Sequence, residues 1–93
     1  MEFEWDDAKR ARNLQLHGVG FDKAEEAFFD PLALMTSDEG HSFDEDRFRL
    51  LGRSRRNRLL MTVFTWRGDK IRIISAWRAT RREVKGYEER IRF

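Results

Sequence analysis

Cysteine is absent from this chain of 93 residues, so neither a disulfide framework nor a thiolate metal site can hold its fold. Proline occurs once, and no apolar run approaches the roughly 20 residues that span a membrane. Acidic residues rather than a signal peptide follow Met1, and no repeat or Pro/Gly-rich linker divides the chain. These absences predict a single soluble domain over residues 1–93, located in the cytoplasm and without a membrane partner.

Sequence signatures of metal and nucleotide sites are missing as well. The two histidines, His17 and His41, stand 24 positions apart and match no common spacing of metal ligands. The acidic stretch at residues 38–46 lacks the spacing of a calcium-binding loop. There is no phosphate-binding loop, dinucleotide fingerprint or GxSxG motif. We therefore expect no bound metal and no cofactor.

Basic side chains are scarce in the first half of the chain, and acidic ones are scarce in the second. Residues 1–46 hold four basic against thirteen acidic side chains, a net charge of −9, whereas residues 47–93 hold fifteen against four, a net charge of +11. Most of the basic side chains are Arg, whose planar guanidinium matches phosphate and carboxylate. This asymmetry favours a nucleic-acid or acidic protein partner. The alternative is that the two halves fold together and neutralise each other.

A short strand and two helices are expected before the single proline. Residues 2–6 alternate aromatic and acidic side chains, which is the period of a half-buried strand. The aspartates that follow can cap a helix running to about His17, where Gly18 ends it. In "FDKAEEAFFDP", Asp22 is the expected cap of a second helix, with Glu25 in a capping box. Pro31 marks its end.

The rest of the chain predicts strands and one closing helix. "PLALM" is a candidate short strand, and Thr80 with Glu83 forms a capping box that opens the final helix. Val84, Tyr87 and Ile91 would pack that helix on the sheet. Three longer strand signals stand at residues 47–53, 58–66 and 70–77. The expected fold class is α+β, with helices on one face of a mostly antiparallel sheet.

Because successive side chains of a strand point to opposite faces of the sheet, the sequence predicts the face on which each arginine lies. With Phe48, Leu50 and Ile73 facing the helices, Trp77 shares their side. The open face then displays Arg47, Arg49, Arg53, Arg72 and Arg78. Because few carboxylates would share this face, repulsion would be relieved only by a bound anion. The alternative is an ordinary solvated sheet face.

An arginine-rich face suits RNA, because guanidinium groups bind phosphates and Trp66 or Trp77 could stack on a base. Cleavage further requires a base for the 2′-hydroxyl, cations for the charged phosphorane-like state and an acid for the leaving oxygen. The candidates for proton transfer are His17, His41, Glu83 and Tyr87. Each also has a structural interpretation, as a helix end, a loop residue, a cap or a core residue respectively.

The order of motifs over residues 3–89 resembles the BrnT family of type II toxins. The matching motifs are F-x-W-D-x-x-K from Phe3, N-x-x-x-H-G-V from Asn13 and RIISA from Arg72. The resemblance implies a fold similar to RelE toxins, with two N-terminal helices packed on a mostly antiparallel sheet and a C-terminal helix. It also implies a metal-independent endoribonuclease that inhibits translation. The implied partner is a BrnA antitoxin, a ribbon-helix-helix protein through which the complex contacts operator DNA.

The same resemblance implies roles for individual side chains. The catalytic candidates are Arg53, Arg72 and Arg78 for holding phosphate, with His17, Glu83 and Tyr87 assisting. The RNA-binding candidates are Arg47, Arg49, Trp77, Arg81 and Arg82. In the family an arginine often follows "ISA" directly, whereas here Trp77 intervenes before Arg78, and such an offset moves a side chain to the other face. Arg72 is therefore the first arginine to test. The alternatives are a non-catalytic binding module and a degenerate toxin that keeps antitoxin binding.

Overall fold

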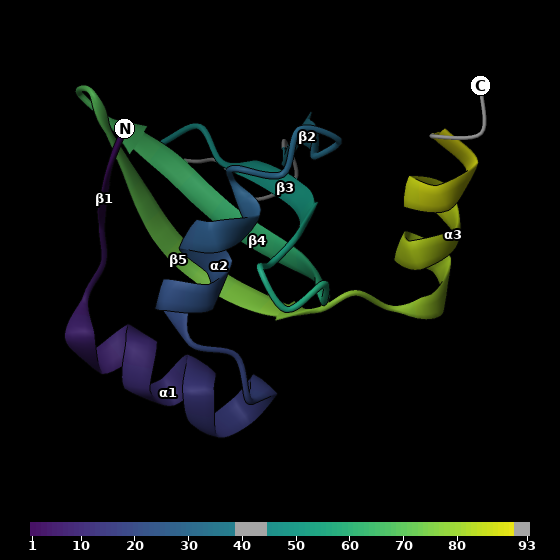
Figure 1. The fold of residues 1–93 in the computed structure, drawn as a ribbon. Coiled ribbons are helices and arrows are strands. Elements are labelled where there is room, and N and C mark those ends of the chain that lie inside the picture. Colours follow the sequence, from purple (N-terminus) through teal and green to yellow (C-terminus); the bar gives the residue numbers. More distant parts are fainter. Residues whose placement is uncertain (39–44, 91–93) are drawn as a thin grey trace.

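Five strands and three helices follow one another in the expected order, β-α-α-β-β-β-β-α, in the computed structural model, which describes residues 1–38 and 45–90 (Figure 1). The helices are α1 (Asp7–His17), α2 (Phe21–Ala27) and α3 (Arg81–Arg90). The strands are β1 (Glu2–Glu4), β2 (Leu34–Ser37), β3 (Phe48–Arg53), β4 (Leu59–Arg67) and β5 (Lys70–Arg78). None of these helices is long and apolar enough to cross a bilayer. The candidates His41 and Ile91 lie outside the described residues.

The strands form one sheet in the order β1-β5-β4-β3-β2. All neighbouring pairs are antiparallel except β1 and β5, which run parallel. Asn57, with φ of 64°, and Gly68, with φ of 63°, take the left-handed conformation that the two tight turns of β3–β4 and β4–β5 require. The expected α+β class with a mostly antiparallel sheet is confirmed.

The helix caps agree with the sequence at α1 but not at α2. Asp6 accepts a hydrogen bond from the Lys9 backbone N–H at 3.0 Å, and Gly18 ends α1 with φ of 68°. The expected cap at Asp22 is wrong, because the N-cap of α2 is Gly20, two residues earlier. Phe21 is fully buried, so its packing in the core sets the start of the helix.

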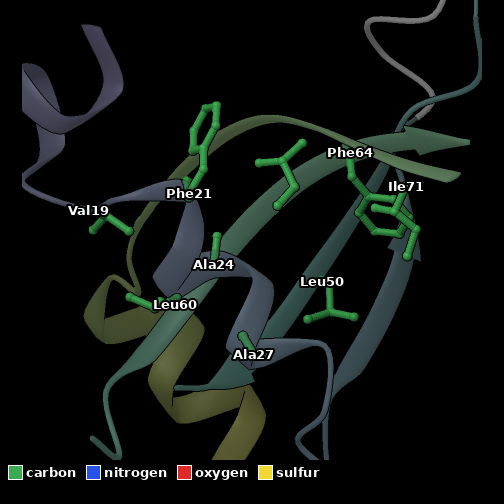
Figure 2. Close-up of a cluster of buried hydrophobic side chains, with 10 residues drawn as sticks. Val19, Phe21, Ala24, Ala27, Leu50, Leu60, Phe64 and Ile71 are labelled. Atoms are coloured by element: carbon green, nitrogen blue, oxygen red, sulfur yellow. The ribbon is translucent and has the colours of Figure 1, made fainter. Parts of the chain in front are cut away.

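The main hydrophobic core lies between α2 and one face of the sheet, hereafter the helix face (Figure 2). Burying a large side chain such as Phe21 or Phe64 stabilises the fold by about 1.5–3 kcal/mol. The buried members are Val19, Phe21, Ala24, Ala27, Leu50, Leu60, Phe64, Ile71, Ile73 and Ala76. Because α1 also contacts β5, the two N-terminal helices pack on the sheet as expected.

A second, smaller cluster lies on the opposite face of the sheet, hereafter the open face. It joins Leu51, Leu59 and Met61 to Tyr87 of α3. Consecutive apolar residues in β3 and β4 point to opposite faces, so both faces need cover. In Figure 1, α3 accordingly stands away from α1 and α2. The expectation that all helices share one face is wrong, although the packing of Tyr87 and Val84 against the sheet is confirmed.

A β-bulge at Ile74 reverses the alternation of β5. Phe64 pairs with Ile73, but the preceding residue of β4, Val63, pairs with Ser75, so Ile74 has no partner in β4. Beyond the bulge, Trp77 lies opposite Met61 on the open face, and Arg78 lies opposite Leu60 on the helix face. The expected faces of Trp77 and Arg78 are therefore wrong, because one extra residue exchanges the two faces.

Asn13 of α1 completes the edge of the sheet beyond β1. Its Nδ2 donates to the Ala76 carbonyl at 2.8 Å and to the Val19 carbonyl at 3.0 Å, and its Oδ1 accepts from the Ala76 N–H at 3.1 Å. β1 pairs only with residues 70–72 of β5, so the amide of Asn13 substitutes for a neighbouring strand further along. Asn13 is buried, and it fixes the C-terminal end of α1 beside β5.

Candidate functional site

Side chains from four elements meet at Trp77 on the open face, and we call His17, Arg49, Trp77 and Glu83 the Trp77 cluster. The His17 ring of α1 lies 6.2 Å from the Trp77 ring, centroid to centroid. The Arg49 guanidinium carbon of β3 lies 5.8 Å from the centre of the same ring. Trp77 Nε1 donates to Glu83 Oε1 of α3 at 3.3 Å. The fold thus brings together four of the predicted site residues.

Arg49 keeps a partly accessible positive charge. Its side chain is 35% exposed, and its Nε lies 3.5 Å from Asp38 Oδ1, which follows β2. This Nε is itself buried and makes no hydrogen bond. The guanidinium therefore stands between one carboxylate and the Trp77 ring, where the charge is only partly compensated.

Arg53 lies on the same face at the end of β3. Its guanidinium carbon is 5.2 Å from the centre of the Tyr87 ring, and its Nη1 donates to the Asn57 carbonyl at 3.3 Å. Among the residues that the structure describes, no carboxylate forms an ion pair with it. Arg53 therefore adds a positive charge to the open face, next to Tyr87 and the carboxylate of Asp30.

Tyr87 connects α3 to the body of the protein through Asp30. Its hydroxyl donates to Asp30 Oδ2 at 2.8 Å, and this oxygen also accepts from the Arg53 N–H at 2.8 Å. Burial raises the pKa of Asp30, but the hydrogen bonds from Arg53, Leu32 and Tyr87 outweigh it and leave the pKa below its usual value. Burial, followed by the bond to Asp30, raises the pKa of Tyr87. The Tyr87 hydroxyl therefore stays protonated as the donor to Asp30, and Tyr87 holds α3 against the body of the protein.

Glu83 has a structural task that the sequence predicts and a second one that it does not. The capping box is present, because Glu83 Oε1 accepts from the Thr80 N–H at 2.8 Å and Thr80 Oγ1 accepts from the Glu83 N–H at 3.2 Å. The same Oε1 also holds the indole N–H of Trp77. Glu83 therefore fixes both the start of α3 and the orientation of Trp77.

Arg72 lies on the open face as expected, but it is ion-paired. Its Nη1 is 2.7 Å from Glu4 Oε2, and Glu4 stands opposite it on β1. Carboxylates also approach Arg49 from Asp38, and Arg47 and Arg67 from Glu45. The expectation that few carboxylates share this face is therefore wrong, because the acidic N-terminal half supplies them to the arginines.

The remaining predicted residues lie apart from the Trp77 cluster. Arg78 belongs to the helix face, and Arg81 and Arg82 are exposed in the first turn of α3. Trp66 is 46% exposed beside Phe64. Within residues 1–38 and 45–90, no group of three or more His, Asp or Glu side chains is placed to hold a metal ion.

Sequence reasoning missed the contributions of Asn13 and Asp30. Both are polar side chains that accept or donate several hydrogen bonds between segments far apart in the chain. Asn13 stands four residues before His17 and therefore on the same side of α1. That spacing could have placed Asn13 in the site together with His17. The sequence around Asp30, by contrast, indicates only the end of a helix.

The ion pair of Arg72 gives a test of its role through Glu4. Arg72→Ala and Glu4→Gln should each lower the free energy of unfolding by about 1 kcal/mol in urea denaturation, because each breaks the half-buried pair. If the pair only anchors β1, both variants should bind RNA like the wild type. Weaker RNA binding by Arg72→Ala together with stronger binding by Glu4→Gln would instead place Arg72 on the RNA.

Comparisons with known proteins agree with the fold described above. A family model described as "Ribonuclease toxin, BrnT, of type II toxin-antitoxin system" matches residues 5–83. Among solved structures, the chain is similar to the ribonuclease toxin BrnT of Brucella abortus, with a TM-score of 0.66 and 21% sequence identity. That match covers 87% of this chain and 99% of the other, and it shows a shared fold. No curated protein matches the chain.

Proposed function

The chain belongs to the BrnT family of ribonuclease toxins of type II toxin-antitoxin systems, and we propose that it cleaves RNA at the Trp77 cluster. The observation that carries this proposal is the meeting of an imidazole, a guanidinium and an indole at one point of the open face. Arg53 adds a second guanidinium without an ion pair among the described residues. Phosphate transfer needs this combination of a proton acceptor and fixed positive charges.

In the proposed reaction, the ribose 2′-oxygen attacks the neighbouring phosphorus while the bond to the 5′-oxygen of the next nucleotide breaks. His17 accepts the proton of the 2′-hydroxyl, because imidazole exchanges protons near neutral pH. Arg49 and Arg53 stabilise the extra negative charge on the phosphate oxygens. Solvent protonates the leaving 5′-oxygen, since Glu83 and Tyr87 are already engaged in hydrogen bonds. The products carry a 2′,3′-cyclic phosphate and a 5′-hydroxyl.

Cleavage of cellular RNA by this route would inhibit translation, and the chain's own side chains would suffice without a metal ion. Membership of a type II family implies an antitoxin partner. We propose an antitoxin of the BrnA type, a ribbon-helix-helix protein that contacts operator DNA in the complex. Several arginines, among them Arg53, Arg81 and Arg82, form no ion pair in the described residues. An acidic antitoxin segment would cover them.

The test is incubation of the purified chain with single-stranded RNA, with and without a chelator. We expect cleavage at the same rate in both samples, and no cleavage of RNA whose 2′-hydroxyls are methylated, because the attacking group is then blocked. Loss of cleavage on chelation would contradict the metal-free route. Intact RNA in every sample, from a folded protein that still binds RNA, would favour the alternative of a non-catalytic module. Two observations favour this alternative. The Tyr87 hydroxyl already donates its hydrogen bond to Asp30, and Arg72 is already paired with Glu4.

A further inference from the structure

A small hollow on the helix face is surrounded by positive charge. It has a volume of about 70 Å³, several times the roughly 10–15 Å³ that a cavity needs to hold one water molecule. It lies where the ends of β3 and β5, the start of β4 and the segment between α1 and α2 come together. Its lining comprises Gly18, Val19, Lys23, Ser54, Arg56, Arg58, Leu60 and Arg78. A compact anionic group fits a space of this size.

Among residues 1–38 and 45–90, no carboxylate lines the hollow, and three of its four cations have no acidic partner. Arg56, Arg58 and Arg78 form no ion pair within the described part of the chain. Lys23 is the exception, with its Nζ 3.5 Å from Glu26 Oε2. Arg47, Arg49, Arg67 and Arg72 each have a carboxylate nearby, whereas Arg53, like the arginines of the hollow, forms no ion pair among the described residues. The unrelieved repulsion at the hollow therefore marks it as a site for an anion.

The fold places these charges through two specific features. The bulge at Ile74 brings Arg78 to the helix face, where it lies opposite Leu60. The tight turn at Asn57, with φ of 64°, brings the neighbouring arginines to the same end of the sheet. The buried Ser54 accepts a hydrogen bond from the Arg58 N–H at 3.4 Å through its Oγ, which places its hydroxyl at the lining of the hollow.

We propose that the hollow binds a backbone phosphate of the RNA substrate, on the same strand as the phosphate that is cleaved at the Trp77 cluster. This inference rests on the proposed function. Trp77 and Arg78 are successive residues of β5, so their Cα atoms are about 3.8 Å apart although their side chains point to opposite faces. Arg53 and Ser54 adjoin in the same way at the end of β3. A single RNA strand that crosses this end of the sheet contacts both the Trp77 cluster and the hollow.

The test is the salt dependence of binding to a short single-stranded RNA carrying 2′-O-methyl groups, which cannot be cleaved. The variant Arg56→Gln/Arg78→Gln removes two guanidinium groups from the hollow. The control Arg67→Gln/Arg90→Gln removes the same charge from distant exposed positions. For single strands, each phosphate contact contributes about 0.7 to the slope of log K against log salt concentration. We expect the hollow variant to lower the slope by about 0.7 or more, and the control to leave it unchanged.

Equal slopes for the wild type and the hollow variant would overturn the proposal, as would an equal decrease for the control. A hollow variant that binds polyglutamate more weakly but RNA with an unchanged slope would also overturn it, because the hollow would then receive an acidic protein segment. The binding measurement is independent of cleavage. A changed slope in a protein that does not cut RNA therefore supports the hollow and contradicts only the proposed function, whereas cleavage with an unchanged slope contradicts only the hollow. Thermal unfolding of each variant verifies that it is folded.

Discussion

Replacing His17 with Asn should lower the rate of RNA cleavage by about 10²–10⁴-fold, because the 2′-hydroxyl loses its proton acceptor. His17 is exposed at the last position of α1, so the substitution removes no core contact. Asn cannot exchange a proton near neutral pH, but it keeps a polar side chain of similar reach. The measurement is single-turnover cleavage at saturating protein, which separates the chemical step from RNA binding.

A matched control for His17→Asn is Gln15→Asn, which changes an exposed side chain two residues earlier in α1. We expect this control to cleave RNA at the wild-type rate and both variants to unfold at the wild-type temperature. If His17→Asn cuts RNA as fast as its control, the proton acceptor is a different group and the proposed role of His17 is wrong.

Replacing Asn13 with Asp should lower the free energy of unfolding by about 3 kcal/mol or more. The side chain of Asp has the same shape, but an ionised carboxylate cannot donate the two hydrogen bonds that Asn13 Nδ2 gives to the carbonyls of Val19 and Ala76. Both carbonyls would then face a buried negative charge without a partner. Urea denaturation measures the effect, and Gln15→Asp, which adds the same charge at an exposed position of α1, should change stability by only about 0.5 kcal/mol.

Asn13→Asp should also impair cleavage in the fraction that stays folded. Asn13 is the hydrogen-bonding link between α1 and the bulged part of β5, and it therefore sets the position of His17 beside Trp77. A stability loss below about 1 kcal/mol would contradict the account, because it would mean that the edge of β5 does not depend on this amide.

The order of the elements could be predicted from the sequence because each has a local signal. Asp6 and Gly18 delimit α1, and the Thr80–Glu83 box opens α3. The side of the sheet on which α3 packs could not be predicted in this way. It depends on whether Leu51 and Met61 need cover on the second face, which is decided by the assembled sheet.

The candidate site was predictable as a set of residues but not as an arrangement. His17, Arg49, Trp77 and Glu83 were all named from the sequence, and the structure brings them together. Strict alternation gave the wrong faces for Trp77 and Arg78, because a bulge has no reliable signal in "RIISAW". The ion pair of Arg72 was hidden for a related reason. Glu4 lies 68 positions away in the chain and becomes its neighbour only when β1 pairs with β5 in parallel.

The most direct test of RNA cleavage at the open face compares Arg49→Gln with Arg67→Gln in the presence of a chelator. Both variants lose one arginine that has a carboxylate nearby, but only Arg49 contacts Trp77. Single-turnover cleavage by Arg49→Gln should be slower than that of the wild type by about 10²–10³-fold, while Arg67→Gln should cleave at the wild-type rate. Equal rates for the two variants, with both proteins folded, would contradict the assignment of the Trp77 cluster as the place where RNA is cut.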